Sequence, residues 1–319
     1  MGGTIHVLTG CTAVGKTALA LEWAEANGAE IVSCDSLLFY RGMDIGTAKP
    51  SREELARLPH HLVDICEVRE RMDVTHYITK ARAAVEDIRR RGRKVLVTGG
   101  SGFYLKAFFA PVADDNEVPA ELRTELRGRL EQEGLDALLA ELRGLNPDGL
   151  GELDVRNPRR VLRALERCRA SGRTLAELEK EFAEQPGPFA DCEVRLCELV
   201  REKADLERRI EERVGQMLRA GLVEEVRGLL GRGLKENPSA AKAIGYRETI
   251  DFIEGRLPAP SRSNGPERGL AAAIARNTRA LVKKQRTWFK TQLPPHAVVD
   301  AASADLMQLK AIFPLKVTT

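Results

Sequence analysis

A glycine-rich loop near the start of the chain has the residue types and spacing of a phosphate-binding site. It fits the pattern G-x-x-x-x-G-K-[ST] and consists of Gly10, Cys11, Thr12, Ala13, Val14, Gly15, Lys16 and Thr17. An apolar run precedes it and a helical segment follows, so backbone N–H groups and a helix dipole point at one spot. Lys16 supplies a charge for terminal phosphates, and the Thr17 hydroxyl is suited to ligate Mg²⁺. The motif predicts a phosphate or diphosphate site without specifying the compound.

Asp35 is the first candidate for acid–base chemistry. It follows the apolar run Glu30-Ile31-Val32-Ser33, which is typical of a buried strand. A carboxylate at the end of the second strand of such a fold faces the acceptor of the bound phosphate compound, where it can deprotonate or orient that acceptor. The alternative role is an N-cap for a following helix. The position of Asp35 favours catalysis.

Two absences argue against a nucleotide kinase or ATPase. Residues 95–98, Val-Leu-Val-Thr, have no aspartate where a Walker B acid would stand, and Asp64 is a weak substitute. No motif for recognition of a nucleotide base is evident. His60 and His61 are interpreted as structural, because no acidic or cysteine spacing near them indicates a metal.

The elements that position these residues alternate between strands and helices. Strands are expected at residues 5–8, 30–33, 61–65, 94–98, 193–200 and 297–299, and helices at 74–91, 203–219, 239–254 and 267–291. The alternation predicts an α/β fold, a P-loop NTPase-like parallel sheet with helices on both faces. Ligands of such sheets bind beyond the carboxyl ends of the strands, so the loop, Asp35 and Ser101 should converge in one cleft.

A helical insertion is expected to divide this fold. The acidic, proline-bounded stretch at residues 111–119 marks a shift in composition, and only helical periodicity follows it. The predicted domains are the first part of the core at 1–116, an all-helical insertion at 117–192, and the second part of the core at 193–319.

Two helical faces carry charges of one sign. In the first, Arg156, Arg159, Arg160, Arg163 and Arg167 share one face of a helix that Asn157 and Pro158 begin. The second lies between Arg276 and Lys290, a stretch with no acidic residue. Either face can be simply solvated. Two such faces on a chain of net charge +3 favour an extended phosphate backbone as the ligand.

Composition predicts a cytoplasmic protein that does not enter membranes. The six cysteines form no C-x-x-C pair, which is typical of free, buried thiols in a reducing compartment. No apolar stretch approaches the length needed to span a bilayer. The protein is expected to act as a monomer.

The motifs together resemble the tRNA dimethylallyltransferase family, also described as tRNA delta(2)-isopentenylpyrophosphate transferases. The similarity rests on the glycine-rich loop and on the stretches 35–50, 59–65, 99–104, 244–247 and 278–289, and it spans residues 4 to about 290. Cys11, Val14 and Ser101 depart from the residues usual in the family, but none of these changes removes a functional group that the mechanism needs.

The resemblance implies a substrate pair and a set of site residues. The donor would be dimethylallyl diphosphate with Mg²⁺, and the acceptor N6 of the adenine 3′ of the anticodon in the tRNA anticodon stem-loop. Asp35 and Ser101 would be catalytic, Arg213 would hold the diphosphate with the loop, and the helical insertion at 117–192 would bind tRNA. The positions matching tRNA contacts are Asp35, Ser36, Leu37, Leu38, Ser101, Arg123, Arg159, Arg160, Val161, Leu162, Arg163, Lys242, Ala243, Ile244, Gly245, Tyr246, Arg247, Lys283, Lys284, Gln285, Arg286, Thr287, Trp288, Phe289 and Lys290.

Three other functions stay open at this point. An adenylate isopentenyltransferase would act on a free nucleotide, but a small acceptor needs neither the insertion nor the basic faces. A P-loop small-molecule kinase lacks its Walker B acid here. A non-catalytic RNA-binding protein would bind tRNA without needing Asp35.

Overall fold

The computed structural model describes residues 2–112, 117–257 and 265–313, and the side chains of 265–267 are not described. The chain divides into two units, Met1–Ala110 with Pro188–Thr319, and Pro111–Gly187. The second unit covers residues 111–187, so each of its boundaries lies a few residues earlier than the matching boundary of the insertion predicted at 117–192. Within the described residues, no helix is both long and apolar enough to cross a membrane.

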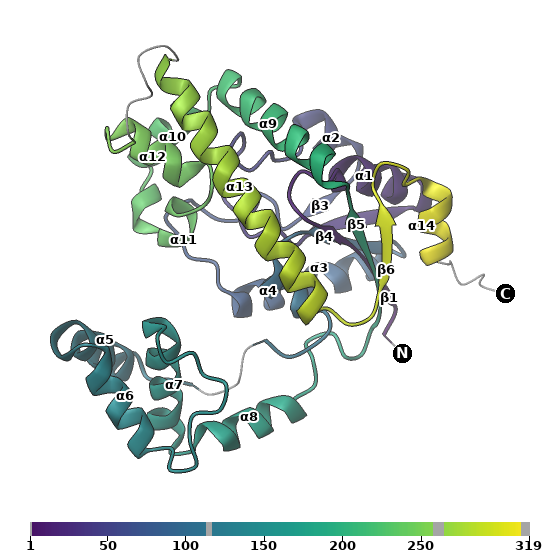
Figure 1. Ribbon diagram of the computed structural model, residues 1–319. Helices are drawn as coiled ribbons and strands as arrows, with labels where there is room; N and C mark the ends of the chain where they lie inside the picture. The colour runs from purple at the N-terminus through teal and green to yellow at the C-terminus, as the bar shows by residue number, and fades with distance from the viewer. Residues whose placement is uncertain (1, 113–116, 258–264, 314–319) are drawn as a thin grey trace. The chain divides into compact units, whose positions relative to one another are not determined.

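Among the described residues, the first unit is built on a six-stranded sheet in which neighbouring strands are parallel (Figure 1). The order is β3-β2-β4-β1-β5-β6. The strands are β1 (Thr4–Gly10), β2 (Ala29–Ser33), β3 (His60–His61), β4 (Lys94–Gly99), β5 (Glu193–Val200) and β6 (Ala297–Asp300). Every residue of β2 is buried, as expected for a strand covered by helices on both faces. The predicted α/β fold is confirmed.

Helices connect and cover these strands. They are α1 (Lys16–Asn27), α2 (Arg52–Arg57), α3 (Val74–Arg90), α4 (Gly102–Lys106), α9 (Lys203–Arg219), α10 (Leu222–Gly231), α11 (Pro238–Ala241), α12 (Tyr246–Ile253), α13 (Gly265–Gln292) and α14 (Leu306–Ile312), with a 3₁₀ turn at Leu234–Glu236. The long helix α13 packs along α9 (Figure 1). The order of the sheet places the phosphate loop after β1, between β4 and β5.

Two element predictions are wrong for backbone reasons. The strand expected at 61–65 ends at His61, because Leu62 and Asp64 have φ angles of 63° and 54° in the left-handed region, which no strand contains. The single helix expected at 239–254 is two short helices, because Gly245 has a φ of 94° between them. The helix at 203–219 and the strand at 193–200 have the predicted bounds.

The second unit contains α5 (Ala120–Glu133), α6 (Leu135–Gly144), α7 (Pro158–Ser171) and α8 (Leu175–Glu184). They bury a separate apolar cluster that includes Leu126, Leu138, Val161, Leu165 and Leu178. Asn157 begins α7 as predicted, since its side chain accepts hydrogen bonds from the N–H groups of Arg159 and Arg160.

Candidate active site

The phosphate loop joins β1 to α1 in a conformation that depends on small residues. Gly10 and Gly15 have φ angles of 148° and 108°, and Ala13 is also left-handed at 65°. A Cβ on Gly10 would lie 2.4 Å from the Leu199 carbonyl oxygen on β5, so the loop can approach the neighbouring strand only with glycine there. Thr17 is exposed in the first turn of α1.

Lys16 is the charged group of this loop. Its Nζ donates to the carbonyl oxygens of Gly10 at 2.8 Å and Cys11 at 3.0 Å. An ammonium group has three donors, so one stays available for a phosphate oxygen. Burial lowers the pKa of Lys16 to about 8, the nearby Asp35 carboxylate opposes that shift, and Arg213 adds to it. The three side chains therefore act on one another electrostatically.

Two arginines of the β5–α9 region hold the outer side of the loop. Arg209 Nε donates to the Ala13 carbonyl at 2.9 Å, and Arg201 Nε donates to the Val14 carbonyl at 3.0 Å. These bonds satisfy backbone carbonyls and bring two positive charges close to the loop. Sequence reasoning missed both residues, although Arg209 lies four residues before Arg213 and so shares its face of α9.

Asp35 and Ser101 stand at the ends of neighbouring strands, as predicted. Ser101 Oγ accepts from the Ser36 N–H at 3.0 Å and donates to Ser36 Oγ at 3.2 Å. One oxygen of Asp35 accepts from the Leu37 N–H at 3.1 Å. These bonds hold the turn after β2 against the turn after β4 and place the carboxylate and the hydroxyl on the same wall.

Arg213 reaches the site from α9. Its guanidinium donates to the Thr47 carbonyl at 2.9 Å, and burial lowers its pKa while Asp35 opposes that shift. The loop before Thr47 is held by Glu225, whose carboxylate accepts from the N–H groups of Asp44, Ile45 and Gly46 at 3.0, 2.6 and 3.1 Å. Sequence reasoning missed Glu225, because no motif marks a helical glutamate that binds a distant loop.

These groups open onto a cavity of about 730 Å³ in the first unit. Its lining includes the polar side chains of Asp35, Ser101 and Arg213 and apolar side chains of α9 and α13. These apolar side chains are Ile210, Val214, Met217, Ile274, Leu281 and Phe289. The cavity thus pairs anion-binding and proton-accepting groups with space suited to an apolar group.

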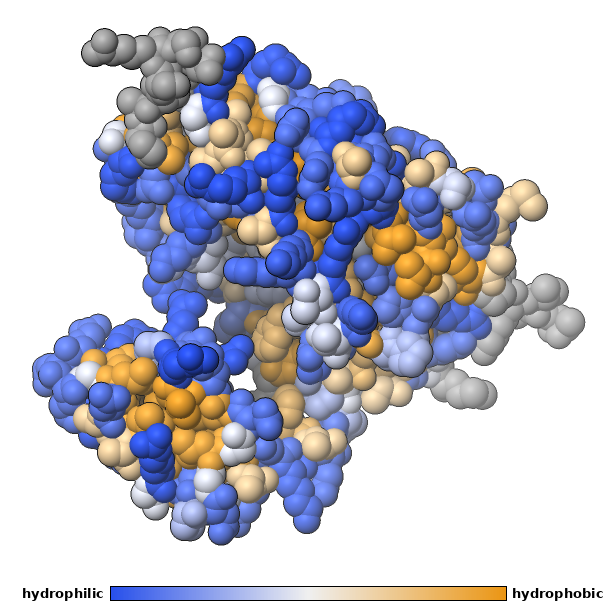
Figure 2. All heavy atoms as spheres, in the orientation of Figure 1, coloured by the Kyte–Doolittle hydropathy of each residue, from blue (hydrophilic) through white to orange (hydrophobic). Residues whose placement is uncertain are grey.

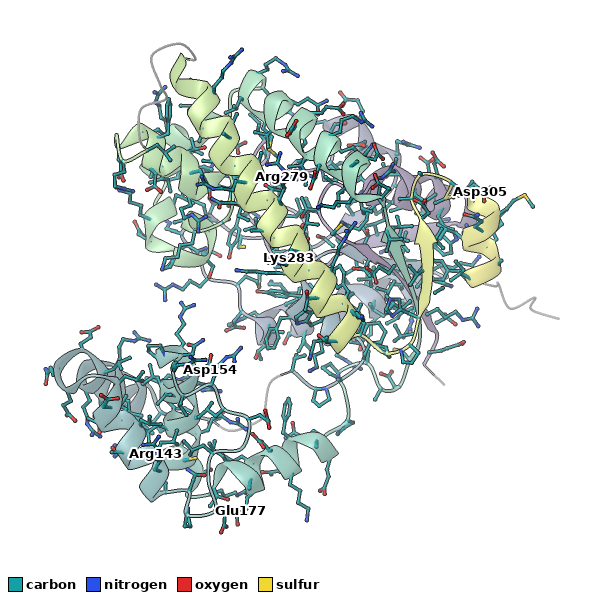
Figure 3. The ribbon with its side chains drawn as sticks, viewed as in Figure 1. Arg143, Asp154, Glu177, Arg279, Lys283 and Asp305 are labelled. Carbon is teal, nitrogen blue, oxygen red and sulfur yellow. The ribbon has the colours of Figure 1, made fainter. Side chains whose placement is uncertain are left out.

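Most of the predicted tRNA contacts of the first unit line the cavity, and some are buried in the core or exposed on α13. Those that line the cavity are Asp35, Ser36, Leu37, Ser101, Lys242, Ala243, Ile244, Gly245, Arg247, Lys284, Gln285, Trp288 and Phe289. Tyr246 is fully buried, and its hydroxyl donates to Glu225 at 2.8 Å, so its side chain has a structural role. Lys283 and Lys290 are exposed on α13, where Lys283 is labelled in Figure 3.

The predicted contacts of the second unit lie on α5 and α7. Arg123 on α5 and Arg159, Arg160 and Arg163 on α7 are exposed, but Val161 is fully buried in the helical core. Arg160 lies 3.8 Å from Asp154, and Arg163 lies 3.3 Å from Glu166. The arginines are therefore available at the surface, and the Val161 side chain is not.

Asp64, the weak substitute for a Walker B acid, and Glu30 both bind basic side chains. Lys49 binds Asp64, and His61 lies 2.7 Å from Glu30, which also binds Arg91. Across the described parts of the chain, no three His, Cys, Asp or Glu side chains gather as a metal site. The contact with Glu30 agrees with a structural role for His61, which stays a prediction.

Comparison with known proteins identifies the family. The model of the family described as IPP transferase matches residues 38–292, most of the chain. This chain belongs to the IPP transferase family. A relative in that family from Opitutus terrae, named tRNA dimethylallyltransferase, is 65% identical over 298 residues, 93% of each chain. A Deinococcus radiodurans protein of the same name is 41% identical over 306 residues, 95% of each chain.

Solved structures of IPP transferases and their relatives share the fold. The tRNA isopentenylpyrophosphate transferase of Bacillus halodurans is 30% identical, with a TM-score of 0.67 over 97% of this chain and 95% of that one. A eukaryotic dimethylallyltransferase that acts on tRNA has a TM-score of 0.79 at 24% identity, over 97% of this chain and 76% of that one.

Proposed function

We propose that the protein transfers the dimethylallyl group of dimethylallyl diphosphate to N6 of the adenine 3′ of the anticodon in tRNA, releasing diphosphate. The observation that carries this proposal is the cavity, which Asp35, Ser101 and Arg213 line beside the phosphate loop together with apolar side chains of α9 and α13. The names of the bacterial relatives and the match to their family support the same activity.

The donor is held by charge at one end and by apolar contact at the other. Lys16 and Arg213 stabilise the charge that grows on the diphosphate as its bond to the prenyl carbon breaks. Thr17 is exposed at the start of α1, and one protein hydroxyl with phosphate oxygens is a usual donor set for Mg²⁺. When bound there, Mg²⁺ would neutralise part of the charge of the leaving diphosphate.

The acceptor needs positioning and proton removal, because the lone pair of an exocyclic adenine amine is delocalised. Asp35 accepts the proton that N6 loses as its bond to the prenyl carbon forms. Ser101 holds the adjacent turn through Ser36 and keeps the Asp35 carboxylate at the cavity wall. An adenine that stacks in an anticodon loop has to leave the stack to enter this cavity.

Recognition of the RNA is assigned to the basic side chains. Arg159, Arg160 and Arg163 on α7, with Arg123 on α5, are proposed to contact phosphates of the anticodon stem-loop. Lys242, Arg247, Lys283, Lys284 and Lys290 are proposed to do so from the first unit. Adenylate isopentenyl transfer and small-molecule phosphorylation remain the competing activities.

One incubation separates these activities. The protein is mixed with Mg²⁺, labelled dimethylallyl diphosphate and either unmodified tRNA or AMP, with labelled ATP in a parallel tube. Label is expected in tRNA from the prenyl donor alone. Label in AMP but not in tRNA would favour the adenylate transferase, and label from ATP in a small molecule would favour a kinase.

A further inference from the structure

Gln285 on α13 binds two segments of the site at once. Its Oε1 accepts from the Thr12 N–H at 3.0 Å, and its Nε2 donates to the Gly100 carbonyl at 2.9 Å. A backbone N–H only donates and a carbonyl only accepts, so these two bonds fix the orientation of the side-chain amide. Both polar atoms of Gln285 are therefore engaged within the protein.

One of the two segments belongs to the proposed diphosphate site, and the other belongs to the proposed acceptor site. Thr12 belongs to the phosphate loop, and Gly100 directly precedes Ser101, which holds the turn that carries Asp35. A Cβ on Gly100 would lie 3.0 Å from Gln285 Nε2, 3.1 Å from the Gly10 carbonyl and 3.7 Å from Lys16 Nζ. The amide thus lies between the diphosphate loop and the turn that carries Ser101.

The helix that carries Gln285 is itself anchored at this place. Trp288 packs against Gly102, since a Cβ there would lie 2.6 Å from the indole ring. Arg286 donates to the Arg201 carbonyl at 2.7 Å, and Phe289 is buried. A side chain that extends from a fixed helix can hold two loops at a set separation.

We propose that Gln285 is a positioning residue that sets the separation between the diphosphate loop and the Asp35–Ser101 turn. The inference rests on the proposed prenyl transfer, and it replaces the predicted tRNA contact of Gln285. Displacing reacting groups by about 1 Å costs on the order of 100-fold in rate, so one amide that holds both loops affects turnover more than it affects binding.

Two substitutions distinguish the effect of the two Gln285 hydrogen bonds from the effect of the side chain's size and shape. Gln285→Met has similar length and makes neither bond. Gln285→Glu accepts from the Thr12 N–H in both protonation states, but only its protonated form has an O–H that can donate to the Gly100 carbonyl. The charged groups around position 285 are Lys16, Asp35, Arg213, Lys284 and Arg286.

The test measures single-turnover prenyl transfer to tRNA, with separate binding of magnesium diphosphate and of tRNA. Gln285→Met is expected to lower the rate roughly 10- to 100-fold while each dissociation constant changes by less than about threefold. Gln292→Met, at an exposed glutamine of the same helix, is the matched control and should leave all three values unchanged.

The pH dependence of Gln285→Glu gives the decisive second readout. The ratio of its rate to that of the unaltered protein should rise as pH falls from about 6 to about 4.5, because a glutamate takes up its proton only near its ordinary pKa of about 4.3 and protonation restores the donor to Gly100. This ratio keeps the inference testable if the Met variant unfolds.

Weaker tRNA binding at an unchanged rate would make Gln285 a tRNA contact and overturn the inference, as would a Glu variant whose ratio does not change with pH. If the unaltered protein transfers no prenyl group to tRNA, the proposed function fails first. If it does and both variants match it, only the role of Gln285 fails.

Discussion

The basic faces of α13 and α7 look alike in sequence but differ in their surroundings. On α13, Arg279 pairs with Glu211 and Arg286 donates to the Arg201 carbonyl (Arg279 is labelled in Figure 3). On α7, Arg159 and Arg160 are exposed on the side opposite the buried Val161 and Leu165. Hydrophilic side chains cover much of α13 and α9 on the face shown in Figure 2.

The difference separates two tasks that a charge pattern alone cannot distinguish. On α13, Gln285 and Arg286 hold backbone segments beside the proposed reacting groups. Arginines of α7 present charge at the surface of a separate unit, where RNA phosphates can reach it. We therefore expect substitutions of Lys16 and Asp35 to change turnover or donor binding, and substitutions on α7 to change tRNA affinity and its salt dependence.

Removing the positive charge of Lys16 in the phosphate loop should reduce activity more than a rise in pH or the loss of charge on α7. Lys16→Met is expected to lower kcat/KM for dimethylallyl diphosphate about 10²- to 10³-fold, because one of the groups that stabilise the leaving diphosphate is lost. Steady-state kinetics with saturating tRNA measure this value. Lys203→Met, at an exposed lysine of α9, is the control, and an equal loss in that variant would contradict a specific role of Lys16.

The pH dependence of donor binding should show an intermediate effect of the same lysine. Because the pKa of Lys16 is lowered to about 8, the side chain loses its positive charge as pH rises through that value. In the free enzyme, kcat/KM for the donor should then fall about tenfold per pH unit above the pKa. Lys16→Arg should remove this fall, since arginine stays charged. A fall that persists in the arginine variant would assign the pKa to another group.

Removing surface charge from α7 should have the smallest effect and a different kind of effect. Arg159→Gln with Arg160→Gln is expected to weaken tRNA binding and to reduce the slope of log affinity against log salt by about 1.5, since each phosphate contact contributes about 0.7–0.9. The rate at saturating tRNA should not change. Arg143→Gln with Arg173→Gln, at exposed arginines of the same unit, is the control, and an equal change in slope there would mean nonspecific attraction.

Sequence patterns predicted the strand-end site because local rules determine it. The phosphate-loop motif requires a strand before it and a helix after it, and parallel strands bring Asp35 and Ser101 to the same edge. The residues that hold these groups from a distance could not be predicted in this way. Glu225 binds the N–H groups of Asp44–Gly46 across about 180 residues of chain, and Gln285 binds Thr12 across 273.

Backbone conformation explains the remaining differences. The apolar pattern at 61–65 favours a strand, but the left-handed Leu62 and Asp64 end it and turn Asp64 toward Lys49. The charge pattern of 276–290 indicated a basic face correctly, but it could not show which of its polar side chains bind the protein itself. Those choices depend on tertiary contacts with β1, β4 and α9.

The most direct test of the site is a single-turnover measurement with Asp35→Asn. Asparagine keeps an oxygen that can accept from the Leu37 N–H, so the turn is preserved, but it cannot take the N6 proton. The enzyme–tRNA complex is mixed with saturating dimethylallyl diphosphate, and tRNA binding is measured separately. The predicted result is a rate lower by about 10²- to 10⁴-fold with unchanged tRNA affinity. Prenyl transfer at the rate of the unaltered protein would contradict the assignment of Asp35 as the proton acceptor.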